Sequence, residues 1–113
     1  MKAMLVFAMA GVLVAGCYRP DELERTANRL TGNMDKTSVS NLFRNFNVLS
    51  SSEGMSFEPY GPTKLFQTNK WCSSSIAFQL KQNPGGDPLW HELCDVWFDT
   101  NGVIVGYRYE VGD

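Results

Sequence analysis

Cysteine and histidine are the residue types in this chain best suited to chemistry, and they are few. The sequence holds three cysteines, Cys17, Cys72 and Cys94, and a single histidine, His91. Cys72, Cys94 and His91 would supply three zinc ligands, but their spacing matches no common zinc pattern. Alternation along a strand also directs His91 and Cys94 to opposite faces of a sheet. We therefore expect no metal site.

Catalytic groups are equally scarce. His91 and Glu92 are neighbours, so on a strand they would point to opposite faces and could not act as an acid–base pair. The sequence contains no nucleophile elbow, no phosphate-binding loop and no carboxylate cluster. Its formal charge is −2 and its basic residues are not clustered, which disfavours a nucleic-acid partner. We expect a non-catalytic protein without a cofactor.

The first 16 residues have the layout of a secretory signal peptide. Lys2 is followed by an uncharged apolar run that ends in the small residues Ala15 and Gly16. The run is shorter than the roughly 20 residues that cross a membrane as a helix. We therefore expect this segment to be removed from the mature protein.

The sequence Leu13-Val14-Ala15-Gly16-Cys17 resembles the lipobox of bacterial lipoproteins. The resemblance implies cleavage before Cys17 and acylation of Cys17. Two or more acyl chains anchor a protein stably, because each buried methylene contributes about 0.8 kcal/mol. Tyr18 is not the aspartate of the inner-membrane retention signal, so the resemblance implies the periplasmic face of the outer membrane. The alternative is an ordinary cleaved signal that happens to precede a cysteine.

Acylation of Cys17 would leave Cys72 and Cys94 as an even pair in an oxidising compartment. Both fall on the predicted core face of neighbouring strands, so we expect a disulfide. A hairpin that closes at 83–86 would place Cys94 opposite about Ser75, and a bulge would have to absorb the offset. A bridge of this kind contributes about 3 kcal/mol. The alternative is two buried thiols.

Two helices are predicted before the strands. Residues 18–34 read as a tether that leads into a helix, with Pro20 in its first turn and Gly32 at its end. A second helix is predicted over 36–46, with Asp35 as its N-cap. Its apolar face carries Val39, Leu42, Phe43 and Phe46.

Residues from Trp71 onward alternate in the manner of strands. We predict a strand from Trp71 to about Leu80, a second over 90–99 and a third over 103–110, the last two joined by a tight turn at 99–102. The 47–69 segment is predicted as a long loop, either packed on the core or exposed as a contact surface. The expected fold class is α+β, with two short N-terminal helices packed on a three-stranded antiparallel β-meander.

The sheet face opposite the predicted core is a candidate surface for a protein partner. Alternation places an apolar cluster with a charged rim there, which is typical of interaction surfaces. Its members are Trp71, Leu93, Trp97, Ile104 and Arg108. The alternative is that the 47–69 loop covers this cluster.

Several short motifs in the chain resemble the BamE/SmpA-OmlA family of small outer-membrane lipoproteins. They are Tyr18–Asp21, Met34–Val39, Thr68–Trp71 and Phe98–Val103. The chain lacks the Gly-Met of the family's helix start, where it has Asn33-Met34, and the Leu-Gly-x-Pro after the second helix. The resemblance implies a signal peptide over 1–16, a lipidated tether and first helix over 17–33, and a domain of this family over 34–113.

These observations lead to an expected function. We expect a lipid-anchored, protein-binding accessory of the cell envelope, and the resemblance implies a role in outer-membrane protein assembly. The alternative is a periplasmic inhibitor or exclusion lipoprotein that blocks an enzyme or an incoming particle. The sequence leaves the partner and the oligomeric state open.

Overall fold

The computed structural model describes residues 22–57, 59, 61–68, 71–81 and 89–112, with the backbone alone for 54–57. The helices are α2 (Glu22–Ala27) and α3 (Lys36–Leu42), and the strands are β1 (Asn47–Phe57), β2 (Lys64–Leu65), β3 (Cys72–Gln79), β4 (His91–Phe98) and β5 (Ile104–Gly112). The predicted signal peptide, Cys17 and the tether as far as residue 21 lie outside the described residues.

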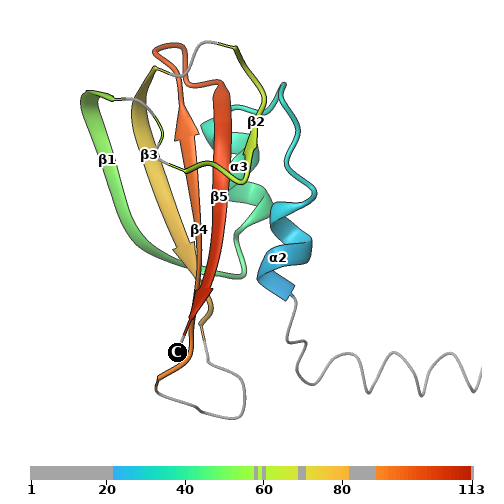
Figure 1. Cartoon of the computed structure of the whole chain (residues 1–113). Helices are drawn as coiled ribbons and strands as arrows, with labels where there is room; N and C mark the ends of the chain where they lie inside the picture. Colours follow the sequence, from blue (N-terminus) through green and yellow to red (C-terminus); the bar gives the residue numbers. More distant parts are fainter. Residues whose placement is uncertain (1–21, 58, 60, 69–70, 82–88, 113) are drawn as a thin grey trace, which may run out of the picture.

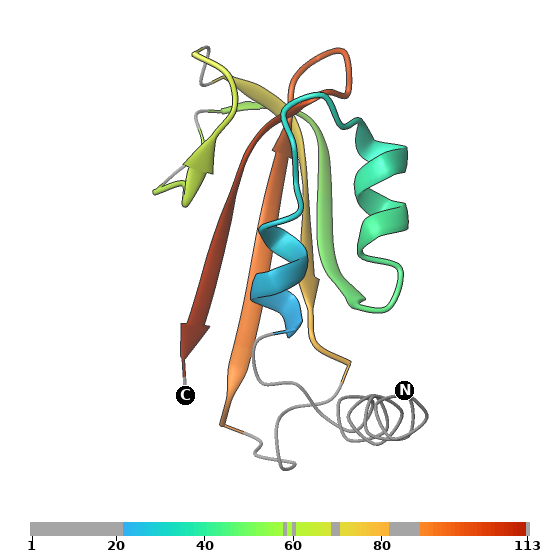
Figure 2. The same ribbon diagram turned by 90° about the vertical axis from the view of Figure 1, so that its right-hand side faces the viewer.

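The strands form one five-stranded antiparallel sheet in the order β1-β3-β4-β5-β2. Both helices lie on the same face of this sheet (Figures 1 and 2). The predicted three-stranded meander is therefore wrong as an architecture. The three expected strands are the middle of a larger sheet, and the molecule is mostly antiparallel sheet with two short helices on one side.

The 47–69 segment supplies the two strands that the sequence did not predict. Ser50, Ser51 and Ser52 have little preference for strands, but β1 lies at the sheet edge, where backbone pairing with β3 is enough. Most of its described side chains are exposed, so no apolar alternation marks it. At the other edge, the backbone N–H of Thr63 and of Phe66 donate to the carbonyls of Tyr107 and Val105. The predicted long loop is thus replaced by two edge strands.

The second predicted helix begins as expected, and both helices end earlier than predicted. The side chain of Asp35 accepts a hydrogen bond from the backbone N–H of Ser38 at 2.8 Å, which confirms it as the N-cap of α3. This bond also lowers the pKa of Asp35. The helix stops at Leu42 instead of residue 46, and α2 stops at Ala27, before Gly32.

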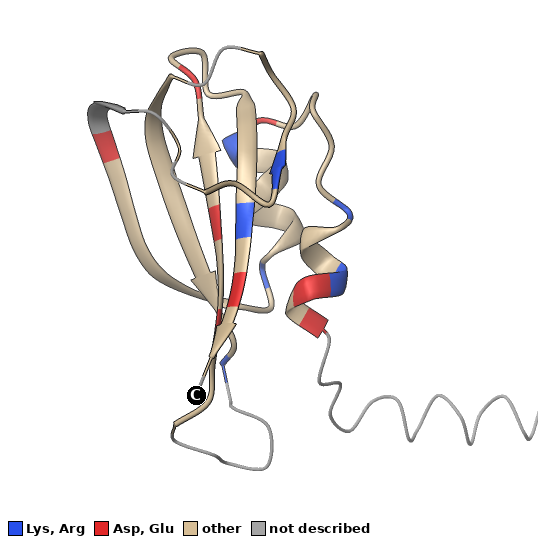
Figure 3. Cartoon of the chain, viewed as in Figure 1, with Lys and Arg blue, Asp and Glu red and all other residues tan. Residues whose placement is uncertain are grey.

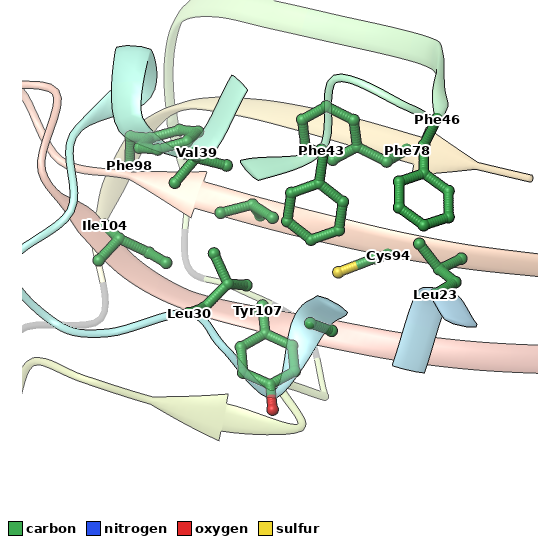
Figure 4. Close-up of a cluster of buried hydrophobic side chains, with 12 residues drawn as sticks. Leu23, Leu30, Val39, Phe43, Phe46, Phe78, Cys94, Phe98, Ile104 and Tyr107 are labelled. Atoms are coloured by element: carbon green, nitrogen blue, oxygen red, sulfur yellow. The ribbon is translucent and has the colours of Figure 1, made fainter. Parts of the chain in front are cut away.

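The main core lies between the helices and the sheet (Figure 4). Phe43, just after α3, stacks on Phe78 of β3 with ring centroids 4.4 Å apart and an interplanar angle of 10°. Stacked aromatic pairs of this kind stabilise a core beyond the area that they bury. Its other buried members are Leu23, Ala27, Leu30, Val39, Phe46, Cys94, Val96, Phe98, Ile104 and Tyr107.

A bulge near the start of β5 changes which side chains face the core. Trp97 pairs with Gly106 and Phe98 pairs with Ile104, so Val105 has no partner position in β4. An extra residue of this kind shifts the alternation of a strand. Ile104 therefore faces the helices and Val105 faces the other way, the reverse of the predicted arrangement.

Candidate functional site

The sheet face turned away from α2 and α3 is the candidate binding surface, and we call it the open face. The register aligns Ser50, Ala77, Asp95 and Arg108 in one row across four strands. The next row runs through Asn47, Gln79, Leu93 and Glu110. In these two rows the positions in β1 and β3 are small or neutral, whereas β4 and β5 carry charged residues (Figure 3).

Three charged groups gather on the open face. Arg108 donates to Glu110 at 2.7 Å, and the side chains of this ion pair are 33% and 39% exposed. Asp95 lies opposite Arg108 in the neighbouring strand. Burial raises the pKa of Asp95, the charge of Glu110 raises it further, and Arg108 partly opposes both. Among the described residues, Arg108 therefore only partly offsets the effects of burial and of Glu110 on the Asp95 carboxylate.

The predicted surface residues do not come together as expected. Leu93 and Arg108 are half-buried on the open face, and Trp71, just before β3, is 60% exposed. Ile104 is buried in the main core, because the bulge at Val105 turns it toward the helices. The predicted surface is therefore wrong for Ile104.

Trp97 belongs to a second, smaller cluster on the face away from the helices. It is buried with Cys72 and Val105, and Leu65 of β2 packs against them. The alternative in which the 47–69 segment covers the apolar residues therefore holds for Trp97. The sequence could not indicate this, because β2 is only two residues long.

Cys72 and Cys94 do not form the predicted disulfide. Cys94 pairs with Phe78, which lies six residues along β3 from Cys72. That separation is about 20 Å, whereas a disulfide needs Cα atoms within about 7 Å.

The two thiols are also hard to ionise. Burial raises the pKa of Cys72 to about 11. Burial, with the nearby charge of Asp95, raises that of Cys94 to about 12. Both are therefore protonated thiols at neutral pH.

His91 and Glu92 point to different environments. His91 is exposed, whereas Glu92 is 1% exposed and accepts hydrogen bonds from Trp90 Nε1 at 2.9 Å and from the Tyr109 hydroxyl at 2.7 Å. Glu92 thus ties the beginning of β4 to β5. In the described parts of the chain, no three His, Cys, Asp or Glu side chains are close enough to hold a metal ion.

A shallow polar pocket lies where α3, β1 and the turn after β4 meet. Lys36 Nζ is 3.0 Å from Glu53 Oε1 across its rim, and Ser74 and Asp99 also line it. The Ser74 hydroxyl is buried and makes no hydrogen bond within the described ranges. Because this oxygen is inaccessible to solvent, it is not presented to a ligand. The sequence did not reveal the pocket because Glu53 belongs to the unpredicted strand β1.

The chain matches none of the protein-family models, curated proteins or solved structures with which it was compared. Neither described helix is long and apolar enough to cross a membrane.

Proposed function

We propose that this chain is an outer-membrane lipoprotein whose domain binds an envelope protein and catalyses no reaction. The anchor would be acylated Cys17 on the periplasmic side of the membrane. The sequence Leu13–Cys17, which follows a signal-like segment, supports this part of the proposal. One observation supports the binding role, which is that both described helices lie on the other sheet face, so neither covers the part of the open face around Leu93, Asp95 and Arg108.

The chemistry of the open face suits a polar, reversible protein contact. Small side chains such as Ser50 and Ala77 allow close approach, and Leu93 adds an apolar centre beside the charges of β5. Non-obligate interfaces combine apolar and polar groups in this way. Because Asp95 is only partly compensated, a basic side chain of the partner would stabilise its charged form.

The specific form of the proposal is an accessory in outer-membrane protein assembly. It rests on the short motifs that resemble the BamE/SmpA-OmlA family, between Met34 and Val103. An inhibitor or exclusion lipoprotein would use the same face on a different partner. The identity of the partner separates the two.

Photo-crosslinking in intact cells tests the proposal. Benzoylphenylalanine would replace Leu93 on the open face, and a matched control would replace Ser40 on the exposed side of α3. We expect a protein adduct from position 93 that is absent from position 40 and is weakened by Arg108→Ala. Adducts with barrel-assembly components support the specific form, whereas a hydrolase, a phage protein or a conjugation protein supports the inhibitor alternative. Equal adducts, or none, at the two positions would contradict a binding role for the open face.

A further inference from the structure

The start of α2 and one end of the sheet lie on the same side of the molecule (Figures 1 and 2). The pairs Asn47↔Gln79 and His91↔Gly112 place the starts of β1 and β4 and the ends of β3 and β5 at this end. We call it the near end. The turn after β4, which contains Asn101, lies at the opposite end of the strands.

Large exposed apolar side chains gather toward the near end. Leu89, just before β4, is 72% exposed, and Val111, near the end of β5, is 48% exposed. Val48 and Leu49, at the start of β1, are 60% and 49% exposed. Among the exposed large apolar residues of the described chain, Trp71 alone lies by the other end of the sheet. A group of exposed apolar side chains at one end of a sheet marks a candidate contact surface for a partner or a membrane.

Charged side chains flank the same end. Arg44 precedes β1 and Lys81 follows β3, and both are exposed. Long basic side chains suit a lipid headgroup region, because their stems can lie along apolar surface while the charge stays in water. Glu22 and Glu24 of α2 are also exposed there (Figure 3). Electrostatics therefore gives no strong preference for anionic lipid, and the apolar side chains carry the argument.

The length of chain before α2 limits how far the domain can stand from an anchor at Cys17. Four residues lie between Cys17 and Glu22, so their Cα atoms are five steps along the chain and at most about 18 Å apart. The eight residues of β4 alone extend for about 26 Å. An anchor at Cys17 would therefore keep the near end within reach of the membrane. If the strands stand perpendicular to the membrane, the turn at Asn101 lies on the side of the domain away from it.

We propose that the near end rests on the bilayer surface, with Leu89 and Val111 in contact with lipid. This inference rests on the lipid anchor of the proposed function. It goes further by assigning a membrane-contacting surface and an orientation. In this orientation the strands are perpendicular to the membrane plane, and the open face remains accessible from the periplasm.

Spin labels on the mature protein in phosphatidylcholine vesicles test the orientation. Single variants Leu89→Cys, Val111→Cys and Asn101→Cys would carry a nitroxide, and the unsubstituted protein would give the background from the buried Cys72 and Cys94. A nitroxide in lipid collides more often with oxygen, and a nitroxide in water collides more often with a water-soluble nickel chelate. We expect an oxygen-to-nickel ratio several-fold higher at positions 89 and 111 than at position 101.

The mass of the same reconstituted sample separates this inference from the anchor. If Cys17 carries acyl chains but positions 89 and 111 are as accessible to nickel as position 101, the orientation is wrong and the anchor stands. A mass without acyl chains contradicts the anchor, and the inference about orientation fails with it.

Discussion

Cys94 of β4 lies directly opposite Phe78 of β3, and this pairing keeps the two buried cysteines of the domain apart. Cys94 belongs to the main core beneath the helices. Cys72 belongs to the small cluster with Trp97 on the other side of the sheet. A bridge between them would require a different strand register and would remove the stack of Phe43 on Phe78.

The first prediction concerns these thiols. Protein unfolded in denaturant without a reductant should take up an alkylating reagent at both Cys72 and Cys94. Folded protein at neutral pH should react far more slowly, because burial raises the pKa of both thiols and the thiolate is the reactive form. Peptide mass mapping would locate the labels. Labelling that requires prior reduction would indicate the disulfide that this register forbids.

A second prediction follows from the pKa of Cys94, which is about 12 in the folded protein against 9.0 for an ordinary thiol. Because the pKa of Cys94 is higher in the folded protein, the contribution of Cys94 to stability is complete below about pH 9. This contribution is lost as the pH rises toward 12. Because of this group, the free energy of unfolding should be lower at pH 10 than at pH 7, by an amount on the order of 1 kcal/mol.

Urea unfolding at the two pH values measures the effect. The Cys94→Ala variant is the control, because it should lose less stability between pH 7 and pH 10 than the unsubstituted protein. An equal loss in both proteins would show that Cys94 does not cause it.

Ser74 provides a third prediction, because its hydroxyl is buried without a hydrogen-bond partner among the described residues. A buried polar group left unsatisfied costs about 1–3 kcal/mol. Ser74→Ala should therefore leave the free energy of unfolding unchanged or raise it by about 1 kcal/mol. Ser75→Ala, at a half-buried position of the same strand, should change it by less than about 0.5 kcal/mol. Marked destabilisation by Ser74→Ala would mean that the hydroxyl is hydrogen-bonded in solution.

Gly106 is the site of the fourth prediction, since it allows the close approach of β2. A Cβ atom at this position would lie 2.5 Å from the backbone oxygen of Lys64. Gly106→Ala should therefore displace β2, expose Trp97 and lower the free energy of unfolding by about 1–3 kcal/mol. A red shift of tryptophan fluorescence would report the exposure.

Gly32→Ala is the matched comparison for this variant. Its Cβ would meet only the Phe66 side chain, at 3.2 Å, so its effect should be smaller. An unshifted spectrum and unchanged stability for Gly106→Ala would contradict the packing of β2 over Trp97.

Local signals predicted the elements that local physics determines. Asp35 caps α3 as expected, and the turn at 99–102 has Gly102 at a φ of +78°, which glycine adopts without strain. The strands β3, β4 and β5 carry the apolar alternation that marks a half-buried sheet, and they lie where it predicts them.

Long-range pairing determined what the sequence did not reveal. The serines of β1 form a strand only because β3 offers an edge to pair with. The bulge at Val105 moves Ile104 from the predicted surface into the core, and the neighbouring Gly106 is the one residue there whose type is associated with a bulge. Leu93 and Arg108 of the predicted binding surface therefore remain on the open face. Trp97 is covered by β2, a strand too short to be recognised in the sequence.

The intact mass of the protein extracted from membranes tests whether Cys17 is the lipid anchor. We expect a chain that begins at Cys17, carries acyl chains on that residue and retains the hydrogens of two thiols at Cys72 and Cys94. A mass that corresponds to an uncleaved chain, or to a cleaved chain without lipid, would contradict it.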